Sequence, residues 1–138
     1  MKITHKGQKV EAYSLIMRKE NALDIVSGKK KVETRSANEF YMRMFLDFSD
    51  SKEVKMKQTP AIHFHNYNNT WHLDVMIKSA GFCYLDFETI KEFNDEFDFH
   101  DFDEDAKIYD ELPNEEKPMF FWFEIDEVIG TNIAQFKK

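Results

Sequence analysis

The sequence predicts a small α+β domain in which a mixed β-sheet curls into a partly closed β-barrel with short flanking helices. Of its 138 residues, 42% are hydrophobic and 15% are aromatic, which is enough to build one buried core. Several short stretches with the period of a strand are interspersed with a few short helical stretches. The low content of glycine and proline, four and three residues, argues against low-complexity sequence. We therefore expect residues 1–138 to form a single domain.

The first third of the chain is predicted to form a strand, a helix and a second strand. Glu11–Met17 alternates its apolar side chains, as a half-buried strand does. Residues 20–28 have apolar side chains at helical spacing. Asn21 can cap the start of this helix, and Gly28 can supply the left-handed residue that ends it. Lys31–Arg35 then forms the next predicted strand.

A second helix and a long connector are expected next. Ser36 and Glu39 have the S-x-x-E spacing of a capping box. Within Asn38–Phe48, the apolar residues recur every three or four positions, at Tyr41, Met44, Phe45 and Phe48, which predicts an amphipathic helix. Residues 49–60 are mostly polar and end in a proline, so we expect a loop there.

The segment Ala61–Ile77 is predicted to form a β-hairpin. Asn68 and Asn69 can make a two-residue turn, because asparagine tolerates a positive φ. Counting outward from that turn sets the register. The expected cross-strand pairs are Ile62–Val75, His63–Asp74, Phe64–Leu73 and His65–His72.

One face of this hairpin carries residue types that could bind a metal ion. They are His63, His65, His72 and Asp74. Imidazole and carboxylate groups suit zinc or a similar ion. The alternative is the ordinary polar outer face of a hairpin whose other face is buried. We favour this alternative, so the sequence predicts no metal and no other cofactor.

Residues 86–116 form a strongly acidic segment with 14 aspartates and glutamates. Five phenylalanines lie among them, at Phe87, Phe93, Phe97, Phe99 and Phe102. We expect a helix near Glu88–Phe97, followed by a loop, and then a strand at Met119–Val128. The run of aromatic residues in that strand predicts burial of both of its faces.

Asp101, Asp103 and Asp105 have the D-x-D-x-D spacing of a calcium-binding loop. However, Ala106 stands where such a loop needs glycine, and Leu112 stands where it needs a bidentate glutamate. We therefore expect a solvated acidic loop.

Charge and composition limit the possible functions. The net charge is −7, but residues 1–60 carry +5 and residues 61–138 carry −12. A net acidic protein has a low non-specific affinity for nucleic acid, because that affinity comes mainly from neutralising phosphates. A local basic surface can still bind a phosphate-bearing ligand. Cys83 is the only cysteine, and its apolar neighbours predict a buried thiol. The absence of a long apolar run or a signal-like start predicts a cytoplasmic protein without a membrane partner.

Gly28, Lys30, Glu33 and Arg35 carry the most specific candidate site. Lysine offers a point charge, arginine a planar fork for phosphate or carbonyl groups, and glutamate an acceptor that orients both cations. Strand alternation places Glu33 and Arg35 on one face, and Lys30 joins them only if the chain turns before the strand begins. The alternative is an exposed Glu–Arg pair beside a basic turn, which would contribute little to stability.

These four residues also match G-x-K-x-x-E-x-R, a motif of ASCH domains, and residues 15–35 resemble the start of that family within the PUA-like superfamily. The residues FFWFEIDEVIG near the C-terminus look like the last strand of the family. The resemblance implies a PUA-like β-barrel with a cleft that binds RNA. Some related bacterial enzymes hydrolyse N4-acetylcytidine with the motif lysine, a threonine and a glutamate. Here Lys30 matches, but Glu33 stands in place of the threonine.

The sequence thus leaves three hypotheses. The leading one is a domain that binds RNA or a nucleotide-like or nucleoside-like ligand in a cleft lined by Gly28, Lys30, Glu33 and Arg35. The second is a small hydrolase, an amidohydrolase or a ribonuclease, with Lys30 as the base and Glu33 as the proton carrier. The third is a protein-interaction module that uses the acidic segment 86–111 to bind a basic partner.

Overall fold

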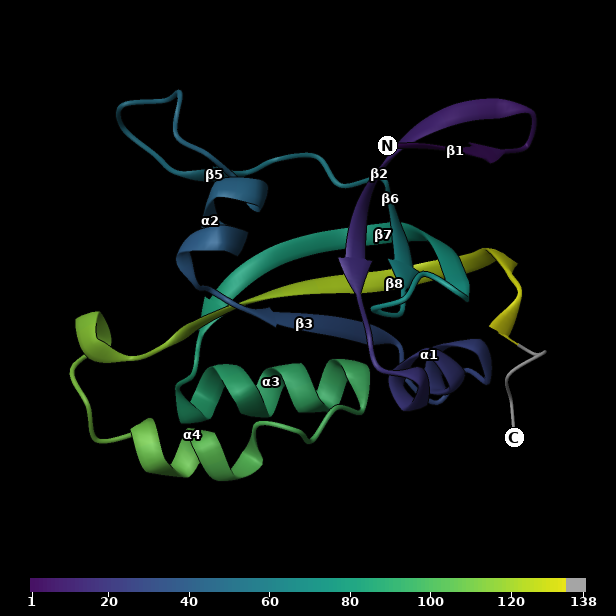
Figure 1. Cartoon of the computed structure of the whole chain (residues 1–138). Coiled ribbons are helices and arrows are strands. Elements are labelled where there is room, and N and C mark those ends of the chain that lie inside the picture. The colour runs from purple at the N-terminus through teal and green to yellow at the C-terminus, as the bar shows by residue number, and fades with distance from the viewer. Residues whose placement is uncertain (134–138) are drawn as a thin grey trace. The chain divides into compact units, whose positions relative to one another are not determined.

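The strands form a mixed six-stranded sheet and a small two-stranded sheet, as the computed structural model of the chain shows (Figure 1). The structure describes residues 1–133, without the side chain at position 114. In hydrogen-bond order, the larger sheet contains β1 (Lys2–His5), β2 (Gln8–Ile16), β6 (Ala61–His65), β7 (His72–Tyr84), β8 (Met119–Thr131) and β3 (Val32–Ser36). The smaller sheet pairs β4 (Leu46–Asp47) with β5 (Lys55–Met56). The helices are α1 (Lys19–Val26), α2 (Glu39–Phe45), α3 (Phe87–Phe97), α4 (Asp103–Tyr109) and the 3-10 helix η1 (Asn114–Glu116).

This mixture of helices and strands confirms the predicted α+β class. The order of the larger sheet starts at β1 and ends at β3, and within residues 1–133 these two strands are not paired. The predicted partial closure into a barrel therefore stays a prediction. None of the described helices is both long enough and apolar enough to cross a membrane.

Contacts between residues divide the chain into two compact units. The first unit contains residues 1–31, residues 58–79 and the chain from residue 124 onward, and the second contains residues 32–57 and 80–123. The long strands β7 and β8 each contribute to both units. The single domain expected from the sequence stays a prediction.

The first unit contains a β1–β2 hairpin, and its β2 strand pairs in parallel with β6. A small apolar cluster lies on this part of the sheet; its buried members are Ile3, Ala12 and Ala61. Helix α1 begins at Lys19, and Arg18 occupies its N-cap position. The expected N-cap at Asn21 is therefore wrong. Gly28 has a φ of +84° and follows the helix end, as predicted.

The hairpin of β6 and β7 has the predicted register, with all four expected cross-strand pairs in place. Alternation of buried and polar residues sets this register, since a slip by one residue would expose the whole apolar face. The turn is longer than predicted. The Asn66 side chain accepts hydrogen bonds from the backbone N–H groups of Thr70 and Trp71, at 2.7 and 3.2 Å, and so closes a loop between residues 65 and 72.

In the second unit, α2 is shorter than the predicted helix and has a different cap. The Asn38 carboxamide oxygen accepts a hydrogen bond from the Tyr41 N–H, so Asn38 rather than Ser36 caps the helix. The helix ends at Phe45, because Leu46 adopts an extended backbone and starts β4.

The aromatic residues of β8 are packed from both sides within the second unit, as the sequence predicts. On one face, Phe121 and Phe123 contact the ring of Phe45, with centroids 5.4 and 4.8 Å apart. On the other face, Phe120 contacts Phe93 at 5.4 Å. A strand buried on both faces needs no polar alternation, which explains its continuous apolar sequence.

Candidate functional site

Strand β3 brings Glu33 and Arg35 together on one of its faces, as strand alternation predicts. The Arg35 guanidinium donates from Nη2 to Glu33 Oε2 at 3.0 Å, and the backbone N–H of Thr34 donates to Glu33 Oε1 at 3.1 Å. The side chains of Arg35 and Glu33 are 14% and 6% exposed. This pair is therefore buried, and the alternative of an exposed Glu–Arg pair is wrong. Burial makes the pair a structural element, because removing one partner would leave an uncompensated charge.

Tyr41, in the first turn of α2, holds the guanidinium from a second direction. Arg35 Nη1 donates to the Tyr41 hydroxyl at 3.0 Å, and the guanidinium carbon lies 5.8 Å from the centre of the Tyr41 ring. The Tyr41 ring is stacked on Phe45, with centroids 5.7 Å apart and planes at 8°. Arg35 is thus fixed by a carboxylate and by an anchored phenol.

Sequence reasoning missed this role of Tyr41. It placed Tyr41 on the apolar stripe of the predicted helix, and its stacking on Phe45 is consistent with that position. The available signal was the phenolic hydroxyl, which normally finds a polar partner when it is removed from water.

Gly28 and Lys30 belong to the first unit, whereas Glu33 and Arg35 belong to the second. The Lys30 N–H donates to the carbonyl oxygen of Asp24 at 3.0 Å, which continues the turn that Gly28 begins after α1. The chain therefore does turn before β3, as a contribution from Lys30 requires. That Lys30 and the Glu33–Arg35 pair serve one ligand stays a prediction.

A hollow of about 390 Å³ lies in the second unit, and Ser36 is one of its lining residues. Three aromatic rings contribute to its wall, those of Phe102, Tyr109 and Phe120, and Asp105 adds a carboxylate. Its volume lies within the usual range for small-molecule pockets. Sequence reasoning did not find this hollow, because it joins segments more than sixty residues apart.

The candidate metal residues do gather on one face of the β6–β7 hairpin. The ring of His63 lies 5.7 Å from that of His65 and 5.6 Å from that of His72, and its Nδ1 shares a hydrogen bond with Asp74. His65 Nδ1 is within hydrogen-bond distance of the Asn66 carbonyl oxygen. Across residues 1–133, no group of three or more His, Cys, Asp or Glu side chains is arranged to hold a metal ion.

One expectation about the acidic segment changes with the structure. Asp103 and Asp105 lie in helix α4, so the predicted solvated loop is wrong. Helix α4 forms where buried Ala106 packs into the aromatic core of the second unit. Cys83 is partly buried beside the same core, as predicted, and burial raises the pKa of its thiol to about 12, with the Asp86 charge adding to the rise.

No protein-family model matches the chain, and no curated protein matches it either. Its fold is similar to that of two solved structures. A mutant of ZmASCH from Zymomonas mobilis is 16% identical, with 90% of this chain and 75% of that chain aligned at a TM-score of 0.51. Hypothetical protein PH0355 is 20% identical, with 86% of this chain and all of that chain aligned at a TM-score of 0.48. By the first of these comparisons, the chain has an ASCH-like fold.

Proposed function

We propose that this chain is a cytoplasmic ASCH-like, PUA-like domain that binds RNA or a nucleotide-like or nucleoside-like ligand. Arg35 is the main ligand contact, Glu33 orients it, and Gly28 and Lys30 contribute as the motif predicts. The observation that carries this proposal is the buried Glu33–Arg35 pair with its Tyr41 support.

A fixed guanidinium suits recognition of a planar polar ligand. Glu33 and Tyr41 hold Arg35 before any ligand arrives, so binding costs less side-chain entropy than it would with a mobile arginine. The carboxylate also offsets the charge of the guanidinium. In this proposal Arg35 therefore binds an uncharged acceptor, such as the carbonyl of a nucleobase. The lysines at positions 29–31 bind the phosphate groups of the ligand.

The hollow lined by Ser36 is a separate candidate for the same class of ligand, since its lining includes neither Glu33 nor Arg35, and Phe120 in its wall faces the side of β8 opposite to Phe45. Aromatic rings such as those of Phe102 and Tyr109 can stack on any nucleobase, a contact worth about 1–3 kcal/mol per base. The Asp105 carboxylate can accept a hydrogen bond from an amino or imino group of a base.

We favour binding over the hydrolase hypothesis because of how Glu33 is held. Each of its two carboxylate oxygens already accepts a hydrogen bond, one from Thr34 and one from Arg35. These contacts suit a residue that positions its neighbour, whereas a proton carrier must exchange hydrogen-bond partners during the reaction.

A calorimetric titration of the chain with nucleosides and short single-stranded RNA tests the proposal. Arg35→Lys retains the charge but loses the planar fork, and we expect it to weaken binding about tenfold or more. The matched control is Arg43→Lys, at an arginine that is 77% exposed, with an expected change below twofold. Lys30→Ala should also weaken binding. Equal affinities for the two arginine variants and the wild type would contradict the proposal.

Chromatography of the same mixtures examines the hydrolase alternative. Conversion of an acylated nucleoside or cleavage of the RNA, lost in Lys30→Ala, would establish an enzyme.

A further inference from the structure

The hollow of about 390 Å³ that Ser36 lines carries a single charged group. Its walls are the chain that follows β3, the start of β8 and one face of α4, all within the second unit. Among the ten described residues that line it, only Asp105 is charged. An uncharged nucleobase would meet one carboxylate in this hollow, whereas a phosphate group would meet no cation in its lining.

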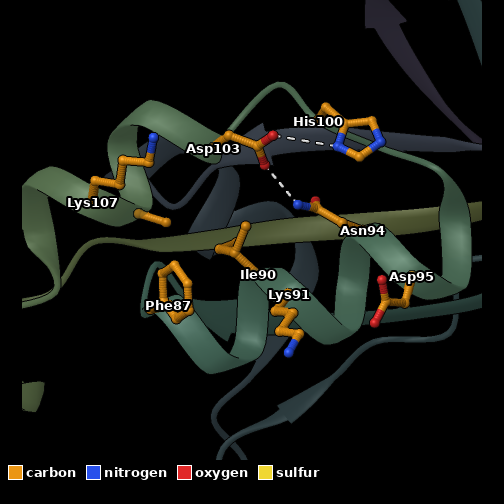
Figure 2. Close-up of a pocket in the computed structure, with 9 residues that line it drawn as sticks. Phe87, Ile90, Lys91, Asn94, Asp95, His100, Asp103 and Lys107 are labelled. Carbon is orange, nitrogen blue, oxygen red and sulfur yellow. Dashed lines mark hydrogen bonds and ion pairs between the residues drawn. The ribbon is translucent and has the colours of Figure 1, made fainter.

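Helix α4 presents three of its residues to the hollow. Phe102, Asp105 and Tyr109 follow one another at intervals of three and four positions, which places them on one face of the helix. Other residues hold the helix in place. Asn94 Nδ2 on α3 donates to Asp103 Oδ1 at 2.6 Å, and Figure 2 shows this bond between the two helices. Asp105 is therefore positioned before a ligand arrives, which lowers the entropic cost of binding.

The Asp105 carboxylate is available to a ligand. Within residues 1–133 it takes part in no ion pair or side-chain hydrogen bond. The residue is partly exposed, and neither of its oxygens is among the described buried atoms that lack a partner. A carboxylate is an acceptor with two oxygens, so it favours a ligand that presents two neighbouring N–H donors.

Guanine is the nucleobase whose hydrogen-bonding edge best matches a carboxylate. Its N1–H and 2-amino groups are neighbouring donors, so the two oxygens of one carboxylate can accept from both. Adenine and cytosine each place a ring-nitrogen acceptor beside the amino group, and uracil flanks its N–H with two carbonyls. Those acceptors would face the carboxylate with the same sign of charge.

Asn38 and Tyr109 supply the other contacts that a base needs. Asn38 Oδ1 accepts from the Tyr41 N–H at 2.9 Å, which leaves Nδ2 as a donor for guanine O6. Phe102 and Phe120 contact each other, with centroids 4.7 Å apart. Tyr109 packs against the same core but contacts no other ring among the described residues. Tyr109 is therefore the ring in this wall that can still stack on a base.

We propose that this hollow binds guanine, either as a nucleoside or as one base of an RNA. This inference rests on the nucleotide-like or nucleoside-like ligand proposed above, and it names the base. N1–H and the 2-amino group donate to the two oxygens of Asp105, O6 accepts from Asn38 Nδ2, and the base stacks on Tyr109. The sugar and any phosphate point away from α4, because residues 86–116 carry 14 acidic residues and two basic ones.

Calorimetric titration of the full chain with guanosine, inosine and adenosine tests which edge is recognised. Inosine retains N1–H and O6 but lacks the 2-amino group, so we expect it to bind about tenfold more weakly than guanosine. Adenosine should bind more weakly still. In ¹⁵N spectra, guanosine should shift the backbone amide signals of Asp105 and Tyr109. Tighter binding of the RNA UUGUU than of UUUUU would identify RNA as the source of the base, and guanosine selectivity without it would identify the nucleoside.

Asp105→Asn should change the selectivity in a way that a merely structural role would not. The asparagine oxygen can still accept from N1–H, but its amide donates and therefore suits the 2-carbonyl of xanthosine instead of the 2-amino group of guanosine. We expect the variant to bind guanosine about tenfold more weakly and to prefer xanthosine. The matched control is Asp110→Asn, at an exposed position of the same segment outside the lining, which should leave guanosine binding unchanged.

Equal affinities for guanosine and inosine would overturn the inference, as would a guanosine affinity that Asp105→Asn leaves unchanged. The nucleoside series needs no variant, so it keeps the test valid if Asp105→Asn does not fold. Arg35→Lys should not alter the preference for guanosine over inosine, because Arg35 is outside the lining. RNA binding that Arg35→Lys weakens, without any preference for guanosine, would overturn this inference and support the proposed function. A guanosine preference lost in Asp105→Asn, with RNA binding that Arg35→Lys leaves unchanged, would support this inference and contradict the role of Arg35.

Discussion

Replacing Glu33 with glutamine tests whether the Glu33–Arg35 pair acts as a buried ion pair. The substitution keeps the shape of the side chain and removes its charge, which leaves Arg35 with less compensation at a side chain only 14% exposed. Breaking a buried pair by removing one partner costs about 3–5 kcal/mol. The amide oxygen of the glutamine still accepts one of the two hydrogen bonds, which offsets part of this loss, so we expect the free energy of unfolding to fall by about 2 kcal/mol.

The matched control is Glu39→Gln, which removes the partner of Arg43 on α2. Those side chains are 79% and 77% exposed, and an exposed pair at this helical spacing contributes only about 0.3–0.5 kcal/mol. Urea denaturation, followed by the fluorescence of the two tryptophans, Trp71 and Trp122, measures both variants. If Glu33→Gln costs no more than Glu39→Gln, the pair is not buried and the account of the site is wrong.

Three further predictions concern other parts of the second unit. The hydrogen bond between His100 and Asp98, helped by Asp103, raises the pKa of His100 above its ordinary value of 6.5. The charged imidazole therefore stabilises the fold at low pH, and this contribution is lost as the pH rises through the raised pKa. A proton NMR titration should show a midpoint above 6.5 that falls in Asp98→Asn, and an unchanged midpoint would refute the assignment. Because the Cys83 thiol has a pKa of about 12, iodoacetamide at pH 8 should modify it far more slowly in the folded than in the urea-denatured chain, whereas equal rates would contradict its burial. A methyl group at Gly81 would lie 2.8 Å from the Trp122 ring, so Gly81→Ala should lower the free energy of unfolding by about 1–3 kcal/mol and shift the tryptophan emission; a variant as stable as the wild type would show that this contact is not tight.

The features that sequence reasoning predicted well depend on local patterns. The register of the β6–β7 hairpin follows from strict alternation, since only one pairing buries Phe64 and Leu73 together. The two-sided packing of residues 119–123 of β8 follows from their unbroken apolar run, whereas residues 126–128 of the same strand are exposed. The positive φ at Gly28 follows from the preference of glycine for helix ends.

The features that it missed depend on contacts between distant segments. Helix α4 has an acidic sequence typical of a loop, but the Asn94–Asp103 hydrogen bond and the burial of Ala106 hold it against α3. Such tertiary contacts override local propensity. Five residues separate Arg35 from Tyr41 in the sequence, and the contact between these two side chains forms only because α2 packs on β8. The start of α2 differs from the prediction because the Asn38 carboxamide oxygen, rather than the Ser36 hydroxyl, accepts a hydrogen bond from a backbone N–H.

The most direct test of the proposed function observes Arg35 itself during ligand binding. The side-chain Nε–H signal of Arg35, assigned by its loss in Arg35→Lys, can be followed in ¹⁵N spectra while uridine, cytidine and short RNA are added. The account predicts that this signal shifts in a saturable way with at least one of these ligands. A ligand that binds, as calorimetry would show, while the Arg35 signal stays unmoved would contradict the claim that Arg35 contacts the ligand.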